Sequence, residues 1–262
     1  MMKTSCNICD SKIRVHDKEI ILNKYNVTYY ICEYCGFIQT EHPYWLEESY
    51  SKAIARADTG AALRNLNNVS DLLFFMKFTK NSSCLDFGGG HGILTRLMRD
   101  YGFNFFHYDK YAENLFASGF EGTLDRKYDI ITSFENFEHF ANPMEEIKMI
   151  LNMTDVLYFS THLVADKAPL IKDWWYYSPS TGQHIAFYTK KSLDIIAKKH
   201  NFFLLTDNTT HILSRHEFNK KYFRYHRYYN KIVNKLDIRK YFKKNSLTWD
   251  DHLKIAEENN RT

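Results

Sequence analysis

Apolar residues in the middle of the chain gather in short runs separated by polar segments. Four runs have the length of buried strands: residues 83–87, 103–108, 128–134 and 156–160. Residues 93–98 and 144–151 have helical spacing, and a helix is expected over residues 190–200 with Thr189 as its N-cap. Strands that alternate with helices predict an α/β domain.

The two ends of the chain have a different character. Residues 20–22 and 27–31 flank a polar turn, which predicts a β-hairpin within residues 1–40. Residues 41–80 look helical, and a segment placed here can cover a ligand or simply pack its aromatic side chains. We therefore expect a small module at 1–40, a helical lid at 41–80, the α/β domain at 81–215 and a helical extension at 216–262.

The composition fits a folded protein, because 44% of the 262 residues are hydrophobic. The net charge of +4 is unevenly distributed: residues 215–244 hold eleven Lys and Arg against two acids, so the remainder is near −5. No apolar run is long enough to span a membrane, and the first residues do not resemble a signal peptide. These features lead us to expect a cytoplasmic location.

Four of the ten glycines lie close together, directly after the strand expected at 83–87. The segment reads Asp86-Phe87-Gly88-Gly89-Gly90-His91-Gly92 and leads into the helix expected from Ile93. A strand, a glycine turn and a helix in this order form a common binding site for anionic groups, although a purely structural glycine turn is the alternative. A dinucleotide fingerprint is excluded, since its third glycine would have to stand at Ile93.

The spacing D-x-G-x-G-x-G, formed by Asp86, Gly88, Gly90 and Gly92, resembles the first motif of class I S-adenosylmethionine (SAM) dependent methyltransferases. The resemblance implies a Rossmann-like sheet with helices on both faces and a loop, including Gly89, that holds the amino-acid end of SAM. Asp109, at the end of the next strand, would take the ribose hydroxyls. Arg64 could clamp a carboxylate or phosphate of the ligand.

A second group of polar residues follows the strand expected at 128–134. Glu135, Glu138 and His139 form the pattern E-x-x-E-H, which again resembles class I methyltransferases. The position lies at the carboxyl edge of the sheet, where ligands bind in such folds. The resemblance implies that Glu135 contacts the cofactor and that Glu138 and His139 lie near the methyl group.

Two C-x₂-C pairs, Cys6/Cys9 and Cys32/Cys35, are separated by 22 residues, close to zinc-ribbon spacing. Four thiolates would fill a tetrahedral site, so a zinc ion held there would be structural. Disulfides are the alternative, disfavoured in a reducing compartment. The fifth cysteine, Cys84, falls inside a strand and is expected to be a small buried side chain.

A closer resemblance combines D-T-G-x-x-x-R-N at 58–65, the glycine loop, E-N-F-E-H at 135–139, D-W-W-Y-Y at 173–177 and G-Q-H-I-x-F-Y at 182–188. These segments look like bacterial methyltransferases of surface-polysaccharide (capsule and lipopolysaccharide) gene clusters. Sugar C-methyltransferases are similar and have a histidine at the position of His184, but they carry a further C-terminal domain. We therefore expect O-methylation of a sugar, nucleotide-linked or phosphorylated.

Methylation of a hydroxyl needs a group that removes its proton, and a neutral imidazole serves near pH 7. His184 is the first candidate, with His139 and His162 as rivals. Trp174, Trp175 and Tyr177 could stack on a sugar ring or simply fill the interior, and His162 lies at the end of a strand beside the expected substrate.

The extension at 216–262 mixes aromatic and basic residues. It could bind a nucleic acid, an anionic membrane, a partner enzyme or a second copy of the chain, or it could pack an aromatic face on the domain. Three other functions remain open: an RNA or protein methyltransferase, a C- or N-methyltransferase of keto- or amino-sugars, and a non-catalytic zinc-containing scaffold.

Overall fold

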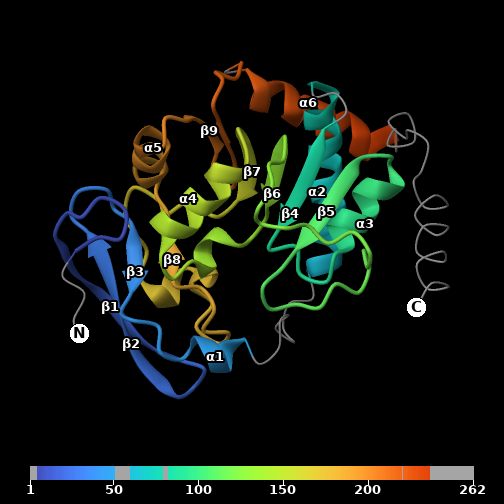
Figure 1. Ribbon diagram of the computed structural model, residues 1–262. Coiled ribbons are helices and arrows are strands. Elements are labelled where there is room, and N and C mark those ends of the chain that lie inside the picture. Colours follow the sequence, from blue (N-terminus) through green and yellow to red (C-terminus); the bar gives the residue numbers. More distant parts are fainter. Residues whose placement is uncertain (1–4, 51–59, 79–81, 220, 237–262) are drawn as a thin grey trace. The chain divides into compact units, whose positions relative to one another are not determined.

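The computed structural model describes residues 5–50, 60–78, 82–219 and 221–236 (Figure 1). They fall into two compact units, Met1–Ala55 with Ser133–Phe218 and Arg56–Thr132 with Asn219–Thr262. Two of the predicted segments lie outside the described residues: the Asp58-Thr59 pair of the D-T-G segment, and residues 237–262 of the C-terminal extension.

The central sheet has six strands in the order β5-β4-β6-β7-β10-β9. Both neighbours of β4 run parallel to it, and β10 runs antiparallel to both of its neighbours. The strands are β4 (Ser83–Phe87), β5 (Asn104–Tyr108), β6 (Ile130–Ser133), β7 (Val156–Ser160), β9 (Phe203–Asp207) and β10 (Thr210–Ser214). The four strands expected in the middle of the chain are confirmed, whereas the hairpin of β9 and β10 was not expected.

The helices follow the apolar periodicity of the sequence. They are α1 (Leu46–Ser49), α2 (Ala61–Phe75), α3 (Ile93–Asp100), α4 (Pro143–Met153), α5 (Lys190–Lys199) and α6 (Tyr222–Leu236). Single 3-10 turns cover Met76–Phe78, Phe137–His139, Ile171–Asp173 and Trp175–Tyr177. Thr189 caps α5 as predicted, and its side chain accepts from the backbone N–H of Ser192 at 3.0 Å.

The N-terminal module is less separate than its sequence suggests. The hairpin of β1 (Ile13–Ile21) and β2 (Tyr25–Cys32) is confirmed, and β3 (Ile38–Thr40) extends it. A fourth strand, β8 (Ala186–Phe187), pairs with β3 although it comes from a distant part of the chain. Phe187 and the buried Tyr29 share one apolar cluster, so this sheet and the segment before α5 fold as one body.

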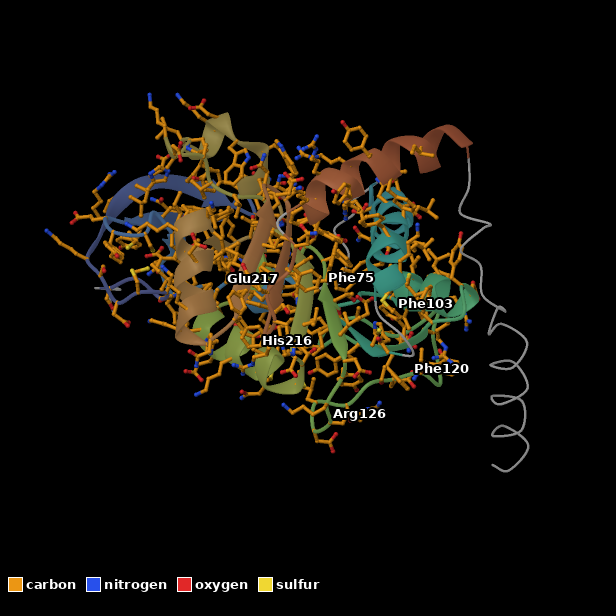
Figure 2. The ribbon with its side chains drawn as sticks, turned by 90° about the horizontal axis from the view of Figure 1, so that it is seen from above. Phe75, Phe103, Phe120, Arg126, His216 and Glu217 are labelled. Atoms are coloured by element: carbon orange, nitrogen blue, oxygen red, sulfur yellow. The ribbon has the colours of Figure 1, made fainter. Side chains whose placement is uncertain are left out.

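In the second compact unit, the parallel strands β4 and β5 pack with α3 (Figure 1). Phe75, Phe103 and Phe120 are all buried side chains of this unit (Figure 2). The guanidinium of Arg99 lies 3.6 Å from the ring centre of Phe120 and donates to the carbonyl of Phe105 at 2.9 Å. This packing fixes the end of α3 and the start of β5, the two elements that follow the glycine loop in sequence.

Helix α6 packs its aromatic face on α2, in agreement with the packing interpretation of the basic extension. The ring of Phe74 lies 5.4 Å from that of Tyr222 and 4.9 Å from that of Tyr229. His226 reaches Asp71 at 3.0 Å. Tyr225 and Tyr228 are 52% and 59% exposed, so a second aromatic face of the helix points to solvent.

Candidate active site

The glycine loop joins β4 to α3 in a conformation that requires glycine. Gly88, Gly90 and Gly92 have φ angles of 73°, 57° and 87°, in the left-handed region. The N–H groups of Gly88 and Gly89 donate to the carbonyl of Tyr108 at 2.8 and 3.2 Å, so the loop is fixed to the end of β5. Gly92 precedes α3 without a side-chain cap, which leaves the positive end of the helix available to an anionic group.

Asp109 follows β5 and binds the loop through its carboxylate. One oxygen accepts from the N–H of Gly90 at 2.9 Å, and the other accepts from the N–H groups of Tyr111 and Ala112, each at 2.8 Å. A carboxylate oxygen has two lone pairs, so these three contacts leave one acceptor site, on the oxygen that binds Gly90. A role of Asp109 toward the ribose hydroxyls remains a prediction.

Asp86 lies beneath the loop and is 1% exposed. Its carboxyl accepts from the hydroxyl of Thr132 at 2.9 Å and, at 3.5 Å, from that of Thr95. Burial, with the charge of Asp109 as a smaller cause, raises the pKa of Asp86 to about 7. A Cβ at Gly89 would lie 2.5 Å from this carboxyl, so Gly89 makes room for it.

His107 is a further residue of this site that the sequence analysis did not single out. It lies buried on β5, and its Nε2 is 2.8 Å from the carbonyl oxygen of Gly90, to which it donates. Thr132 and His107 are polar residues inside largely apolar strands, and Thr95 lies between apolar residues near the start of α3. That interruption is the only signal by which the sequence could have revealed them.

The space beside the loop is an independent reason why the loop fits the amino-acid end of SAM. A Cβ built on Gly90 would meet no atom within 4 Å, so open space lies next to the backbone of the loop. The uncapped start of α3 suits a carboxylate, and backbone carbonyls together with Asp86 suit an ammonium group. Gly88, Gly89 and Gly90 would line the cofactor. The side chain of Arg64 is exposed on α2, and its role as a clamp remains a prediction.

The buried carboxyl of Asp86 predicts a pH-dependent stability. Because its folded-state pKa is raised, this group lowers stability progressively as the pH rises from about 4 to about 7, and by a constant amount above that. Asp86→Asn removes the ionisation but keeps an acceptor for Thr132. The variant should therefore gain stability over the wild type as the pH rises, by on the order of 2 kcal/mol at pH 8 and almost nothing near pH 4. Thermal or urea unfolding across this range would measure the difference, and a pH-independent difference would contradict the burial argument.

In the other compact unit, three predicted catalytic residues come together. Glu138 and His139 lie in the 3-10 turn after β6, and His184 lies in the segment before β8. One ligand-type atom from each of the three lies within 4.8 Å of the others. The N–H of Ile185 donates to the carbonyl of Glu138 at 2.8 Å, which joins these two distant parts of the chain.

Both histidines of the cluster are held through Nδ1. The Nδ1 of His184 donates to the carbonyl of Tyr176 at 2.6 Å, so its Nε2 carries a lone pair. The Nδ1 of His139 lies 2.7 Å from the hydroxyl of Tyr50, a residue that the sequence analysis did not single out. Burial, with His184 as a further cause, lowers the pKa of His139 well below its usual value. His139 is therefore neutral near pH 7.

Glu138 is fully buried, and neither carboxylate oxygen makes a hydrogen bond of good geometry among the described residues. Burial raises its pKa to about 8, with the charge of Glu135 as the next cause. The hydroxyls of Tyr176 and Thr161 oppose this shift weakly, and they lie 3.2 Å from each other. An unsatisfied buried carboxyl is costly, which makes this cluster a candidate functional site.

Glu135 belongs to the same compact unit as the cluster. Its backbone is left-handed, with φ of 49°. The hydroxyl of Ser160 accepts from the N–H of Glu135 at 2.9 Å and donates to its carboxylate at 2.7 Å. These contacts fix the side chain, and its predicted contact with the cofactor remains untested.

The predicted substrate-binding aromatics divide into two kinds. Tyr177 is fully buried and donates to the carbonyl of Pro169 at 2.9 Å, and Trp174 packs edge-on against it, 5.2 Å between ring centres. Packing explains both residues. Trp175, by contrast, is 70% exposed and lies edge-on to His162 at 5.2 Å. Trp175 and His162 are thus the pair that remains available to a substrate.

The four paired cysteines form a compact cluster. The sulfurs of Cys6 and Cys35 lie 3.6 Å apart, and that of Cys9 lies 3.5 Å from those of both Cys32 and Cys35. Tetrahedral zinc at about 2.3 Å from each sulfur would separate them by about 3.8 Å. All four are free thiols, and all four sulfurs lie within 4.8 Å of one another, so the donor set fits zinc. Burial raises the pKa of the remaining thiol, Cys84, in agreement with an unreactive core position.

Comparison with solved structures gives several methyltransferases at low identity. Magnesium protoporphyrin IX methyltransferase (ChlM) from Synechocystis PCC 6803 with bound SAM has 14% identity and a TM-score of 0.39, over 66% of this chain and 92% of that one. The plantazolicin methyltransferase BpumL has 12% identity and a TM-score of 0.43, over 66% and 98%. CalO1, a methyltransferase in calicheamicin biosynthesis, has 12% identity and a TM-score of 0.39, over 58% and 55%. The search of curated proteins gave no match.

The mixed α/β sheet and the D-x-G-x-G-x-G loop define a Rossmann-like enzyme of the class that binds SAM. A family model described as a methyltransferase domain matches residues 59–206, more than half of the chain. The chain belongs to this family and is a SAM-dependent methyltransferase. Among the described residues, no helix combines the length and the apolar character needed to cross a membrane.

Proposed function

We propose that this methyltransferase transfers the methyl group of SAM to a hydroxyl of a sugar, nucleotide-linked or phosphorylated, in capsule or lipopolysaccharide synthesis. The observation that carries the proposal is the cluster of Glu138, His139 and His184, in which the carboxyl of Glu138 is buried and the pKa of His139 is lowered by burial. Its neighbours, Thr161 and Tyr176, add hydroxyl groups. A cluster of this kind suits a neutral hydroxyl, as the group that is methylated, better than a charged group.

The chain's own residues would handle the acceptor and its proton. SAM supplies an electrophilic methyl group on a sulfonium, so the protein has to place a hydroxyl in line with it. The Nδ1 of His184 donates to the carbonyl of Tyr176, so the hydroxyl proton would be taken by its Nε2. A base held in this way contributes about 10²- to 10⁴-fold to the rate. His139, 5.0 Å away between ring centres, is the alternative base.

Trp175 supports a sugar as the acceptor. A largely exposed indole beside His162 offers an apolar face to the C–H groups of a sugar ring and polar edges to its hydroxyls. We expect Trp175→Ala to raise KM for the acceptor more than it lowers kcat, since the residue would contribute binding alone.

For the cysteine cluster we propose one structural zinc ion. Four thiolates leave no open position for catalysis, and the site would stabilise the β1–β2 hairpin and its contact with α5, where Thr189 donates to the carbonyl of Cys35 at 2.6 Å. Elemental analysis should find zinc in the wild type, and Cys32→Ser should contain about one zinc per chain less and lose much of the thermal stability. A folded wild-type protein without zinc would contradict the proposal.

The exposed face of α6 favours a second candidate, an RNA or protein methyltransferase. Arg224 stands in the same exposed part of the helix as Tyr225 and Tyr228. Binding of a nucleic acid there would weaken steeply with salt, whereas binding of a nucleotide sugar would change little. Acceptance of keto- or amino-sugars would instead indicate C- or N-methylation.

Calorimetry against SAM and S-adenosylhomocysteine, followed by methyl-transfer assays on a panel of nucleotide sugars, tests the function. Micromolar binding of SAM and a methylated hydroxyl in the product would support the proposal. Binding of SAM with transfer only to RNA, protein or amino-sugars would replace it with the corresponding alternative. Absence of SAM binding would favour the scaffold.

A further inference from the structure

We infer that Glu138, His139 and His184 bind one divalent transition-metal cation. Its assigned role, at the acceptor hydroxyl, rests on the proposed function. The binding site itself rests on the geometry of three side chains, and it can be tested without any acceptor. This site is separate from the cysteine cluster, because no residue belongs to both groups.

The donor atoms are already close together. One donor atom from each of the three residues lies within 4.8 Å of the others. Ligands of one ion at about 2.0–2.2 Å lie roughly 3 Å apart, so a small inward movement would complete the coordination. The N–H of Ile185 holds the carbonyl of Glu138 at 2.8 Å, so the backbone already positions the two segments that supply the ligands.

The buried carboxyl of Glu138 is a second, independent reason to infer a cation at this cluster. Its carboxyl is fully buried, and both oxygens lack a hydrogen-bond partner among the described residues. Buried carboxylates are normally paired, hydrogen-bonded or bound to a metal. A cation between the carboxylate and the two imidazoles would satisfy this group.

The histidines have the outer contacts that metal-bound histidines usually have. His184 donates from Nδ1 to the carbonyl of Tyr176 at 2.6 Å, and Nδ1 of His139 lies 2.7 Å from the hydroxyl of Tyr50. Such contacts fix the ring orientation and direct the lone pair of Nε2 to the ion. Tyr50 and Tyr176 would thus act through the histidines as positioning residues.

The donor set selects the kind of cation. Two imidazoles and one carboxylate suit zinc, manganese or iron(II), whereas magnesium and calcium prefer oxygen ligands alone. Three protein ligands also leave coordination positions open, unlike the four thiolates of the cysteine cluster.

An open position would bind the acceptor hydroxyl and lower its pKa. The hydroxyl would then release its proton to water. The oxygen would form a bond to the methyl carbon while the bond from that carbon to sulfur breaks, which leaves a methyl ether and S-adenosylhomocysteine. With the cation bound, His184 is a ligand; without the cation, its Nε2 takes the proton directly.

Manganese is the most discriminating probe, because Mn²⁺ binds nitrogen and oxygen ligands and competes poorly for thiolates. Titration with Mn²⁺ of the full-length protein prepared with one zinc per chain, enough for the cysteine cluster alone, followed by electron paramagnetic resonance, should give about one bound Mn²⁺ per chain. Glu138→Gln and His184→Ala should each weaken binding by more than about tenfold. His42→Ala, at an exposed histidine, is the control and should bind Mn²⁺ as the wild type does.

Failure of the wild type to bind Mn²⁺, or equal binding by Glu138→Gln, His184→Ala and the wild type, would overturn the inference. Circular dichroism of each variant would show that it is folded. The outcomes for the two proposals are distinguishable: Mn²⁺ bound by this cluster in a protein that methylates no sugar would retain the cation site and reject the sugar. Sugar methylation without any Mn²⁺ binding would support the sugar as the acceptor and reject the cation site.

Discussion

Gly90→Val should reduce the affinity for SAM by more than about 100-fold while leaving most of the fold in place. The valine side chain would enter the open space next to Gly90, where no protein atom lies within 4 Å of a Cβ, so it would displace cofactor rather than protein. The φ of 57° adds strain, on the order of 1–2 kcal/mol. Calorimetry with SAM and S-adenosylhomocysteine would measure the loss.

A matched variant separates the two effects of the substitution. Gly102→Val places the same side chain at a left-handed glycine, with φ of 83°, just after α3 and outside the loop. It should lose stability by a similar amount and still bind SAM. If Gly90→Val binds SAM normally, the glycine loop is not the cofactor site.

His184→Ala should lower kcat by about 10²- to 10⁴-fold with little change in the affinity for SAM. In the proposed mechanism, His184 would act through its Nε2 either as the base or as a ligand of the cation. His184→Asn keeps a donor that can reach the carbonyl of Tyr176 but loses the basic nitrogen, so it should be nearly as slow. Single-turnover kinetics with saturating SAM would measure the chemical step.

His42→Ala removes an exposed imidazole and provides the control, with kcat expected to stay at the wild-type value. Near-normal turnover of His184→Ala would transfer the role of the base to His139. Near-normal turnover of the double variant His139→Ala/His184→Ala would leave positioning of the acceptor as the main contribution of this cluster.

The local pattern of the sequence was enough to predict the elements around the loop. The strand at 83–87, the glycines that follow and the periodic run from Ile93 are adjacent in the chain, and each preference is local. The N-cap at Thr189 is predictable for the same reason, since its partner lies three residues away. The observed bounds of these elements differ from the expected bounds by no more than two residues.

The composition of each site depended on contacts that no local pattern encodes. His184 joins Glu138 because the backbone of Ile185 binds the 3-10 turn after β6, and β8 joins β3 to complete the N-terminal sheet. The aromatic segment at 173–177 gave no indication that Tyr177 would be buried and Trp175 exposed.

The sequence by itself determined the fold class, the glycine loop and the residue types of the second cluster, because strand propensity, helix periodicity and turn chemistry act over a few neighbouring residues. Only the tertiary structure decided that Asp86 is buried beneath the loop, that Glu138 has no hydrogen-bond partner among the described residues, and that His184 lies beside His139. Burial and pKa depend on which distant segments pack together, and packing is a property of the whole chain.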